Sequence, residues 1–494
     1  MPFSWLAFAM RLDPHFIDYH RLCGLIGIFF ILDLIAFLPF FPVAFRYPGK
    51  ASAGILPNFF EIGLGLLWLG SSVALIAGDA TDRLLGLLVL FIIFRCYYVH
   101  DRWKNVRRGA GAPGFMSAWI VFYLLLLELS CWLDADGRLA LGALNLMKFD
   151  FALIILCAGA YKMLTGYFSG AGMEYGQVNP LWSYHWKYLR RLNPGSPFFS
   201  FSNYTASLVE LSAGLLMLVP VPWLQFTGAL LVSLSFVYIG ALIRLGRLAC
   251  LMAVIPLFFW PYLPSSIIHA SRPLARNLLP SWGISAGMIA IALLMVAMVL
   301  VKIMQYLNLF LNRQLFPLLQ KALTFMADLW PIIIWRVFTP DVTNFFVRIY
   351  TISKSRQKTA LIHESKTYNY SDWRQPLLKL RFLNVTESIA ITSVFTVLKY
   401  FPSKTEVFRE RLLSYAFSIQ AAPCDNVQDL IFEYVAIRKK PGCFEFIPVG
   451  SFTVDLATCL ITEDRYLEDF DFSQPAVYSP VRESVGYGTY VKKH

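Results

Sequence analysis

Long apolar stretches separated by short polar connections dominate the first 305 residues. They lie near 22–41, 60–79, 83–99, 114–133, 140–162, 204–221, 224–243, 245–263 and 282–305. Since about 20 apolar residues cross a bilayer as an α-helix, the pattern predicts a polytopic α-helical membrane protein with about nine transmembrane helices. The stretches 83–99 and 245–263 are short, and we expect them to be tilted, kinked or re-entrant.

The pattern changes after Lys302. Residues 306–340 are amphipathic rather than uniformly apolar, which predicts linker helices lying along the membrane interface or packed on the bundle. Beyond 340 the chain reads as soluble, with a helix near 407–420 and strand-like segments at 431–437, 443–449 and 452–461. We therefore expect three parts: a transmembrane helical domain (1–305), interfacial linker helices (306–340) and a C-terminal α+β or β-rich extramembrane domain (341–494).

Composition agrees with a membrane location. The chain has 57% hydrophobic and only 15% charged residues, with a mean hydropathy of +0.56. The net charge of +12 is better explained by basic loops beside anionic lipid than by nucleic-acid binding. If the chain has nine spans, four basic loops share one face with the C-terminal domain. They contain Arg46 and Lys50, His100–Arg108, Lys187–Arg191 and Arg244–Arg247. The positive-inside rule makes this face cytoplasmic.

Metal and disulfide chemistry is not indicated. The eight cysteines are scattered without a CxxC pair, and the seven histidines show no metal-ligand spacing. The chemistry-bearing residues are instead charged side chains within the apolar stretches, each costing roughly 2.5–3.5 kcal/mol at a helix centre unless it finds a partner or water. They are Asp33, Arg95, Glu128, Lys148, Asp150, Lys162 and Glu210. A structural role suits Arg95, Lys148 and Asp150, which lie near helix ends.

Lys162 has a different setting. Small residues precede it in "CAGAYK" and permit close helix approach, and an aromatic segment running to Trp186 follows it. Loss of hydration at the mouth of an apolar cavity disfavours the ammonium form of a lysine, and a neutral amine is a usable base. The structural alternative is a lysine that snorkels to the interface beside a belt of Trp and Tyr.

The run "AGAYKML" followed by "GYFSGAGMEYGQVNPLW" resembles a segment of the vitamin K-dependent γ-glutamyl carboxylase family. "SLVELSAGLLMLV" (207–219) is similar to the family helix that carries an acidic residue before "LSAG". The opening "RLDPHFIDYHRLCGLIGIFFILDLIAFL" resembles the wider HTTM family, the bacterial relatives of that enzyme. The resemblance therefore implies a multi-pass protein of a bacterial inner membrane. It covers residues 10–300 in organisation and does not extend to the tail.

Carried over to this chain, the resemblance makes Lys162 the catalytic base. It implies that Lys162 deprotonates reduced vitamin K or another quinol, and that oxygenation by O₂ then drives carboxylation of a peptide glutamate with CO₂. Substrate or cofactor contacts are expected from Tyr167, Glu174, Tyr175, Trp182, His185 and Glu210. No metal is implied, and the partners are the lipid bilayer and a peptide or protein substrate.

One feature of the family is missing. The family has a histidine at the start of the helix corresponding to 114–133, where this chain reads "GAPGFMSAW". His100 and His185 are the candidates to replace it. The alternative hypothesis is a non-catalytic HTTM subunit, or a quinone- or lipid-binding protein, that docks a partner through its C-terminal domain. A transporter is disfavoured because the sequence shows no inverted repeat.

Overall fold

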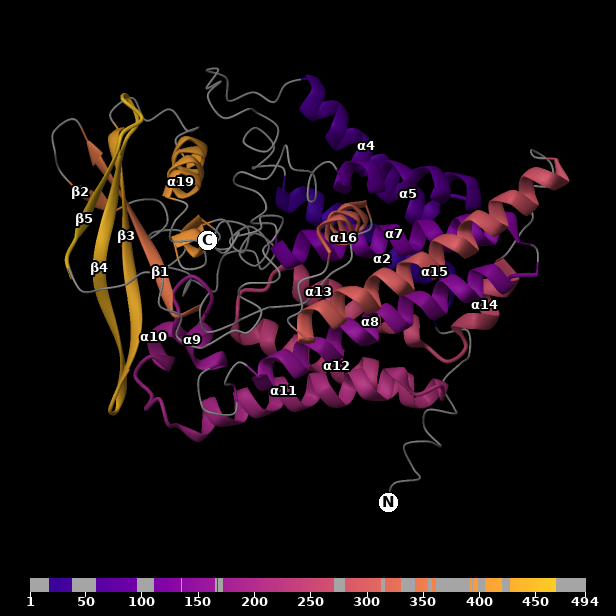
Figure 1. Ribbon diagram of the computed structural model, residues 1–494, viewed down its shortest axis with the longest axis horizontal. Coiled ribbons are helices and arrows are strands. Elements are labelled where there is room, and N and C mark those ends of the chain that lie inside the picture. Colours follow the sequence, from indigo (N-terminus) through magenta and orange to yellow (C-terminus); the bar gives the residue numbers. More distant parts are fainter. Residues whose placement is uncertain are drawn as a thin grey trace.

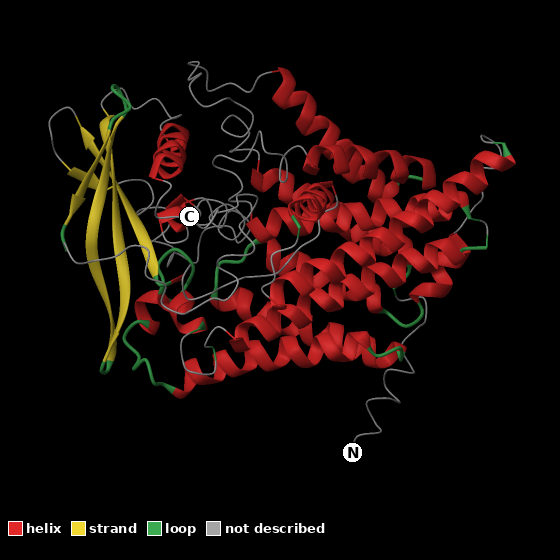
Figure 2. Cartoon of the chain, in the orientation of Figure 1, coloured by secondary structure: helices red, strands yellow, loops and turns green. Residues whose placement is uncertain are grey.

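The computed structural model places a bundle of helices beside an antiparallel sheet (Figures 1 and 2). It describes residues 17–37, 59–95, 111–134, 136–164, 167, 172–270, 280–311, 316–329, 343–353, 358–360, 391–392, 394–398, 405–419 and 427–467. The sheet lies at one end of the bundle, and the long helices run away from it (Figure 1).

Helices occupy all nine predicted apolar stretches. They are α2 (Tyr19–Phe37), α4 (Phe59–Ala77), α5 (Ala80–Phe94), α7 (Gly111–Leu133), α8 (Arg138–Leu164), α11 (Pro197–Leu218), α12 (Pro222–Leu242), α13 (Arg247–Val254) continued by the 3-10 helix η5 (Ile255–Phe259), and α15 (Ser281–Leu311). Four shorter helices accompany them: α9 (Met173–Val178), α10 (Trp186–Leu189), α14 (Leu263–Ala270) and α16 (Pro317–Leu329). The start of α5 has a side-chain cap, since Asp79 accepts from the backbone N–H groups of Thr81 and Asp82.

Four helices of the described chain are long and apolar enough to cross a membrane: α7, α8, α12 and α15. A fifth span results if α13–η5 and α14 are counted together, although they are bent by 83°. The chain is therefore a multi-pass membrane protein, while the ninefold count stays a prediction. The bend falls in the stretch 245–263 that was expected to kink, and α15 runs on to Leu311, past the predicted boundary at 305.

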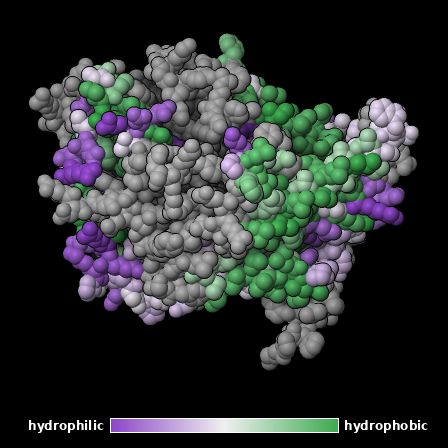
Figure 3. All heavy atoms as spheres, viewed as in Figure 1, coloured by the Kyte–Doolittle hydropathy of each residue, from purple (hydrophilic) through white to green (hydrophobic). Residues whose placement is uncertain are grey.

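The spans differ in how much of their surface is covered. Within its apolar window α7 is 83% buried, whereas α15 is only 22% buried. Thus α7 forms the centre of the bundle and α15 lies at its periphery, presenting apolar side chains outward. Figure 3 shows this as a broad hydrophobic surface over the helices, with hydrophilic residues gathered at the sheet. This distribution is the one a bilayer requires.

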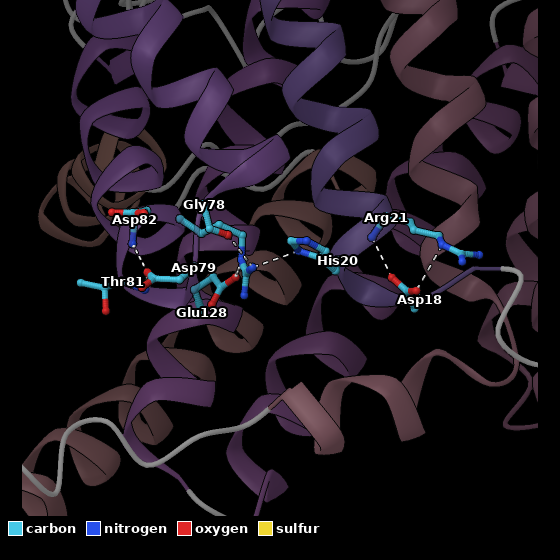
Figure 4. A network of polar contacts seen from close by, with 9 residues as sticks. Asp18, His20, Arg21, Gly78, Asp79, Thr81, Asp82 and Glu128 are labelled. Carbon is cyan, nitrogen blue, oxygen red and sulfur yellow. Dashed lines mark hydrogen bonds and ion pairs between the residues drawn. The ribbon is translucent and has the colours of Figure 1, made fainter.

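Buried ion pairs join the helices. Arg83 of α5 reaches Glu128 of α7 at 2.6 Å, and its guanidinium also lies 3.0 Å from His20 Nδ1 and donates to the Gly78 carbonyl (Figure 4). Asp150 of α8 is paired with Lys302 of α15 at 2.7 Å. Asp150 therefore has a specific ion-pair partner, which agrees with the structural role expected for it. Asp33 is fully buried in α2.

The C-terminal sheet has the order β2-β1-β3-β4-β5 and is antiparallel throughout. Its strands are β1 (Phe345–Ser353), β2 (Lys358–Ala360), β3 (Val427–Lys440), β4 (Cys443–Asp455) and β5 (Ile461–Arg465). β3 and β4 form a hairpin in which Lys440 pairs with Cys443, and Gly442 has a φ of +85°, a conformation that glycine adopts without strain.

Sequence and structure differ in part of this sheet. The segment 452–461, expected to be strand-like, divides between the end of β4 and the start of β5. The Asp455 side chain accepts hydrogen bonds from the backbone N–H groups of Ala457 and Thr458 and from the Thr458 hydroxyl, which stabilises a turn. Helix α19 (Thr405–Ile419) confirms the predicted helix and packs on the sheet through Phe408 against Phe452.

The sheet is anchored to the end of the bundle by the segment that follows α9. Asn179, fully buried, donates at 2.7 Å to the carbonyls of both Thr343 and Phe345, where β1 begins. Phe444 of β4 donates its N–H to the Arg190 carbonyl and packs edge-on against Phe199. The described loops with Lys187–Arg191 and Arg244–Arg247 thus lie at the end that carries the sheet. The loops near 46–50 and 100–108 lie outside the described residues.

Candidate functional site

Close packing of α8 on α11 positions Lys162. A Cβ on Gly159 would lie 2.6 Å from Leu211 N, and one on Gly214 would lie 2.6 Å from Leu156 Cα. Only glycine allows the two backbones to approach this closely. The small residues before Lys162 therefore permit the close helix approach that the sequence predicted. This approach of α8 and α11 brings Lys162 of α8 beside Glu210 of α11.

Lys162 and Glu210 form a buried ion pair. Lys162 Nζ donates to Glu210 Oε1, and the two residues are only 3% and 1% exposed. The second carboxylate oxygen, Glu210 Oε2, is enclosed and has no hydrogen-bond partner among the described residues. Since an enclosed carboxylate oxygen without a donor carries an unfavourable desolvation energy, Oε2 is the atom of this pair that is open to a ligand's donor group.

Tyr167 lies over the pair. Lys162 Nζ is 5.8 Å from the centre of the Tyr167 ring, and the Tyr167 N–H donates to the Lys162 carbonyl. Gly172 packs so tightly on this ring that a Cβ would lie 2.8 Å from Tyr167 Cγ. Burial first, and then the charges of Glu210 and Glu174, raise the pKa of the Tyr167 phenol well above its usual value. Tyr167 therefore stays a neutral hydroxyl.

Glu174 lies near Tyr167 and is held by three donors. Its Oε2 accepts from Gly172 N and Asn203 Nδ2, both at 2.9 Å, and its Oε1 accepts from Lys439 Nζ at 2.7 Å. Asn203 also accepts from Met173 N at 2.7 Å, which fixes the start of α9. Both oxygens of Glu174 are occupied, so we assign it to positioning the loop.

Lys439 was not anticipated from the sequence. It belongs to β3 and comes 265 residues after Glu174, within an ordinary basic "RKK" run. Its Nζ also lies 5.1 Å from the centre of the Tyr175 ring, and Tyr175 packs edge-on against Phe444. Burial, and then Glu174, raises the pKa of Tyr175 to about 12. Tyr175 is therefore part of the contact with the sheet.

Two of the expected site residues make other contacts. Trp182 is buried, and its carbonyl accepts from Arg244 N at 2.6 Å, which ties two loops together. His185 is exposed at the start of α10, and its N–H donates to Ser183 Oγ. Within the described chain no hydrogen bond or ion pair joins His185 to Lys162 or Glu210. His100, the other candidate for the missing histidine, lies outside the described residues.

The structure thus brings together Lys162, Glu210, Tyr167 and Glu174, and adds Asn203 and Lys439. The described residues contain no group of three or more His, Cys, Asp or Glu side chains that could hold a metal ion. Chemically, the cluster offers one basic pair, one open acceptor oxygen and a neutral phenol in apolar surroundings.

No family model matches the chain, and neither does a curated protein or a solved structure.

Proposed function

We propose that this chain is a quinol-dependent, carboxylase-like membrane enzyme. In this proposal Lys162, acting with Glu210, deprotonates a lipid-soluble hydroquinone, and oxygenation is coupled to carboxylation of a glutamate in a peptide substrate. The motif resemblance around Lys162 suggests the reaction class. The observation that carries the proposal is the open acceptor oxygen, Glu210 Oε2, on a buried lysine–carboxylate pair.

The residues suit a proton transfer from a hydroxyl group. A quinol hydroxyl can donate to Glu210 Oε2, and Lys162 Nζ stabilises the negative charge that the departing proton leaves. Because the two side chains are in contact, the proton is held by the pair rather than by either group alone. The quinol supplies the reducing equivalents for reaction with O₂. Exclusion of water protects the strong base that the carboxylation requires.

The placement of the pair supports a lipid-soluble cofactor and a polar substrate. Lys162 lies in the last turn of α8, near the sheet, while the apolar helices extend in the opposite direction. A quinol can enter from the lipid side, and a peptide can approach from the side of the sheet. The neutral Tyr167 hydroxyl and the occupied Glu174 carboxylate line the approach without adding a competing base.

Turnover and binding should be measured on the full-length protein in detergent. The assay follows incorporation of labelled CO₂ into a glutamate-containing peptide in the presence of a reduced naphthoquinone and O₂. We expect Lys162→Met and Glu210→Gln to lower turnover by about 10²–10⁴-fold, as for loss of a general base. Glu210→Gln should still bind the quinone, and Lys321→Met, at an exposed position on α16, should match the wild type. Equal turnover in all four proteins would contradict the role of the pair.

The second candidate is a non-catalytic quinone- or lipid-binding subunit that docks a partner through the C-terminal domain. It is favoured by the absent histidine near residue 114 and by the fact that Lys162 is already ion-paired, as structural lysines are. It predicts quinone binding without carboxylation in the wild-type protein. The same assay therefore separates the two candidates.

A further inference from the structure

Lys148 stands out among the buried cations of the described helices. Arg83, Lys162 and Lys302 each pair with a carboxylate on a neighbouring helix. Lys148, in the middle of α8, is only 7% exposed, yet no side chain or carbonyl of the described chain forms an ion pair or hydrogen bond with it. Asp150 is two residues away on the opposite side of the helix and is paired with Lys302.

The contact that Lys148 does make is too weak to compensate for burial. Its Nζ lies 5.7 Å from the centre of the Phe259 ring. A cation–π contact contributes about 0.5–2 kcal/mol, whereas a lysine at a helix centre costs roughly 2.5–3.5 kcal/mol on insertion scales. The ring therefore offsets only part of the cost, and the rest must come from water or from an anionic partner, which the described chain does not supply.

The position of Lys148 also points to a ligand. Phe259 ends η5, directly before the break at which α13–η5 and α14 diverge by 83°. In transporters, breaks in membrane helices place backbone groups and helix ends at ions and at anionic groups of the substrate. Beside this break the rings of Trp223 and Phe226 pack edge to face on the buried Trp260. Trp223 and Phe226 are half-buried, so they present an apolar surface for a hydrocarbon chain.

We propose that Lys148 and the adjacent helix break form a binding site for an anionic amphiphile, with the ligand's carboxylate or phosphate on Lys148 and its hydrocarbon tail among the apolar helices. The site is distinct from the Lys162–Glu210 pair. Fourteen residues separate the two lysines on α8, or about 21 Å along a helix that rises about 1.5 Å per residue. The proposal therefore does not depend on the quinol reaction.

Three ligands with the same tail test this site: labelled oleate, oleyl phosphate and the uncharged oleyl alcohol. Each is equilibrated with the full-length protein in a neutral detergent. Wild-type protein should bind at least one anionic ligand about tenfold more tightly than oleyl alcohol, the difference expected for one charged contact of about 1.4 kcal/mol. Lys148→Met should lose this difference, Lys148→Arg should keep it, and Lys321→Met should resemble the wild type.

Thermal unfolding separates a binding role from a packing role. Without ligand, Lys148→Met should be at least as stable as the wild type, because the substitution removes a buried charge that has no partner among the described residues. Preference for oleate or for oleyl phosphate identifies the head group, and either result supports the site. The proposal is overturned if wild-type protein binds neither anion more tightly than oleyl alcohol, or if Lys148→Met retains the preference.

Discussion

Two lysine–carboxylate pairs cross the bundle, and they differ in how completely the carboxylate is satisfied. Asp150 Oδ1 lies 2.7 Å from Lys302 Nζ in an ion pair without hydrogen-bond geometry, while its Oδ2 accepts from Trp119 Nε1 and Tyr123 OH, both at 2.8 Å. Glu210 has only Lys162 as a donor within the described chain, and its Oε2 has neither a hydrogen bond nor an ion pair there. A pair in which each carboxylate oxygen faces a cation or a donor stabilises the bundle, whereas an oxygen that faces neither stays available for chemistry.

Glu174 extends the comparison to the junction with the sheet. It has hydrogen-bond donors on both oxygens, one of which, Lys439, comes from the C-terminal domain. Glu174 and Glu210 therefore share one neighbourhood around Tyr167 but have different roles. Burial and pairing alone do not identify a functional carboxylate; an oxygen that faces neither a donor nor a cation does.

The largest stability effect should come from the Asp150–Lys302 pair. Lys302→Met leaves Asp150 buried with its charge uncompensated, so the free energy of unfolding should fall by about 3–5 kcal/mol. Turnover per folded molecule should be unchanged. Thermal unfolding and a turnover assay corrected for the folded fraction measure both quantities. A specific loss of turnover with unchanged stability would show that Asp150–Lys302, rather than Lys162–Glu210, is the reactive pair.

A smaller effect should follow from Gly214→Ala, which separates α8 from α11. The added Cβ would lie 2.6 Å from Leu156 Cα, and overpacking of this kind costs about 1–3 kcal/mol. Because the same approach places Lys162 beside Glu210, turnover should fall more than stability does. Gly24→Ala in α2 is the matched control, since nothing lies within 4 Å of its Cβ position. Equal effects of both substitutions would contradict the close-approach argument.

The smallest effect should come from Lys439→Met at the junction. Lys439 is partly exposed, with 30% of its side chain accessible, so solvent screening limits the loss of stability to about 1 kcal/mol. The readout is protease sensitivity of the linkage between sheet and bundle, measured at low and high salt. Wild-type protein should lose protection as salt rises, and the variant should be insensitive to salt. If the variant keeps the salt dependence, Lys439 does not hold the sheet.

Much of the architecture could be predicted from local pattern. The apolar stretches predicted helices because a backbone in lipid must satisfy its own hydrogen bonds. The spacing and type of residues in the C-terminal part predicted the helix at 405–419 and the strands β3 and β4. β1 was not anticipated, because its pairing depends on β3 about 80 residues later, and sequence spacing carries no information about such distant partners. The turn at 456–458 was missed for a related reason, since it depends on the Asp455 side chain.

The sequence by itself determined that Lys162 lies at the end of an apolar helix, that small residues precede it, and that an acidic residue follows at 210. Only the tertiary structure decided that Glu210 is the partner of Lys162, that Glu174 is held by Lys439 from the sheet, and that Lys148 has no carboxylate within the described chain. The physical reason is that a charge inside a membrane protein is defined by what faces it across helices, and that partner comes from a distant part of the chain.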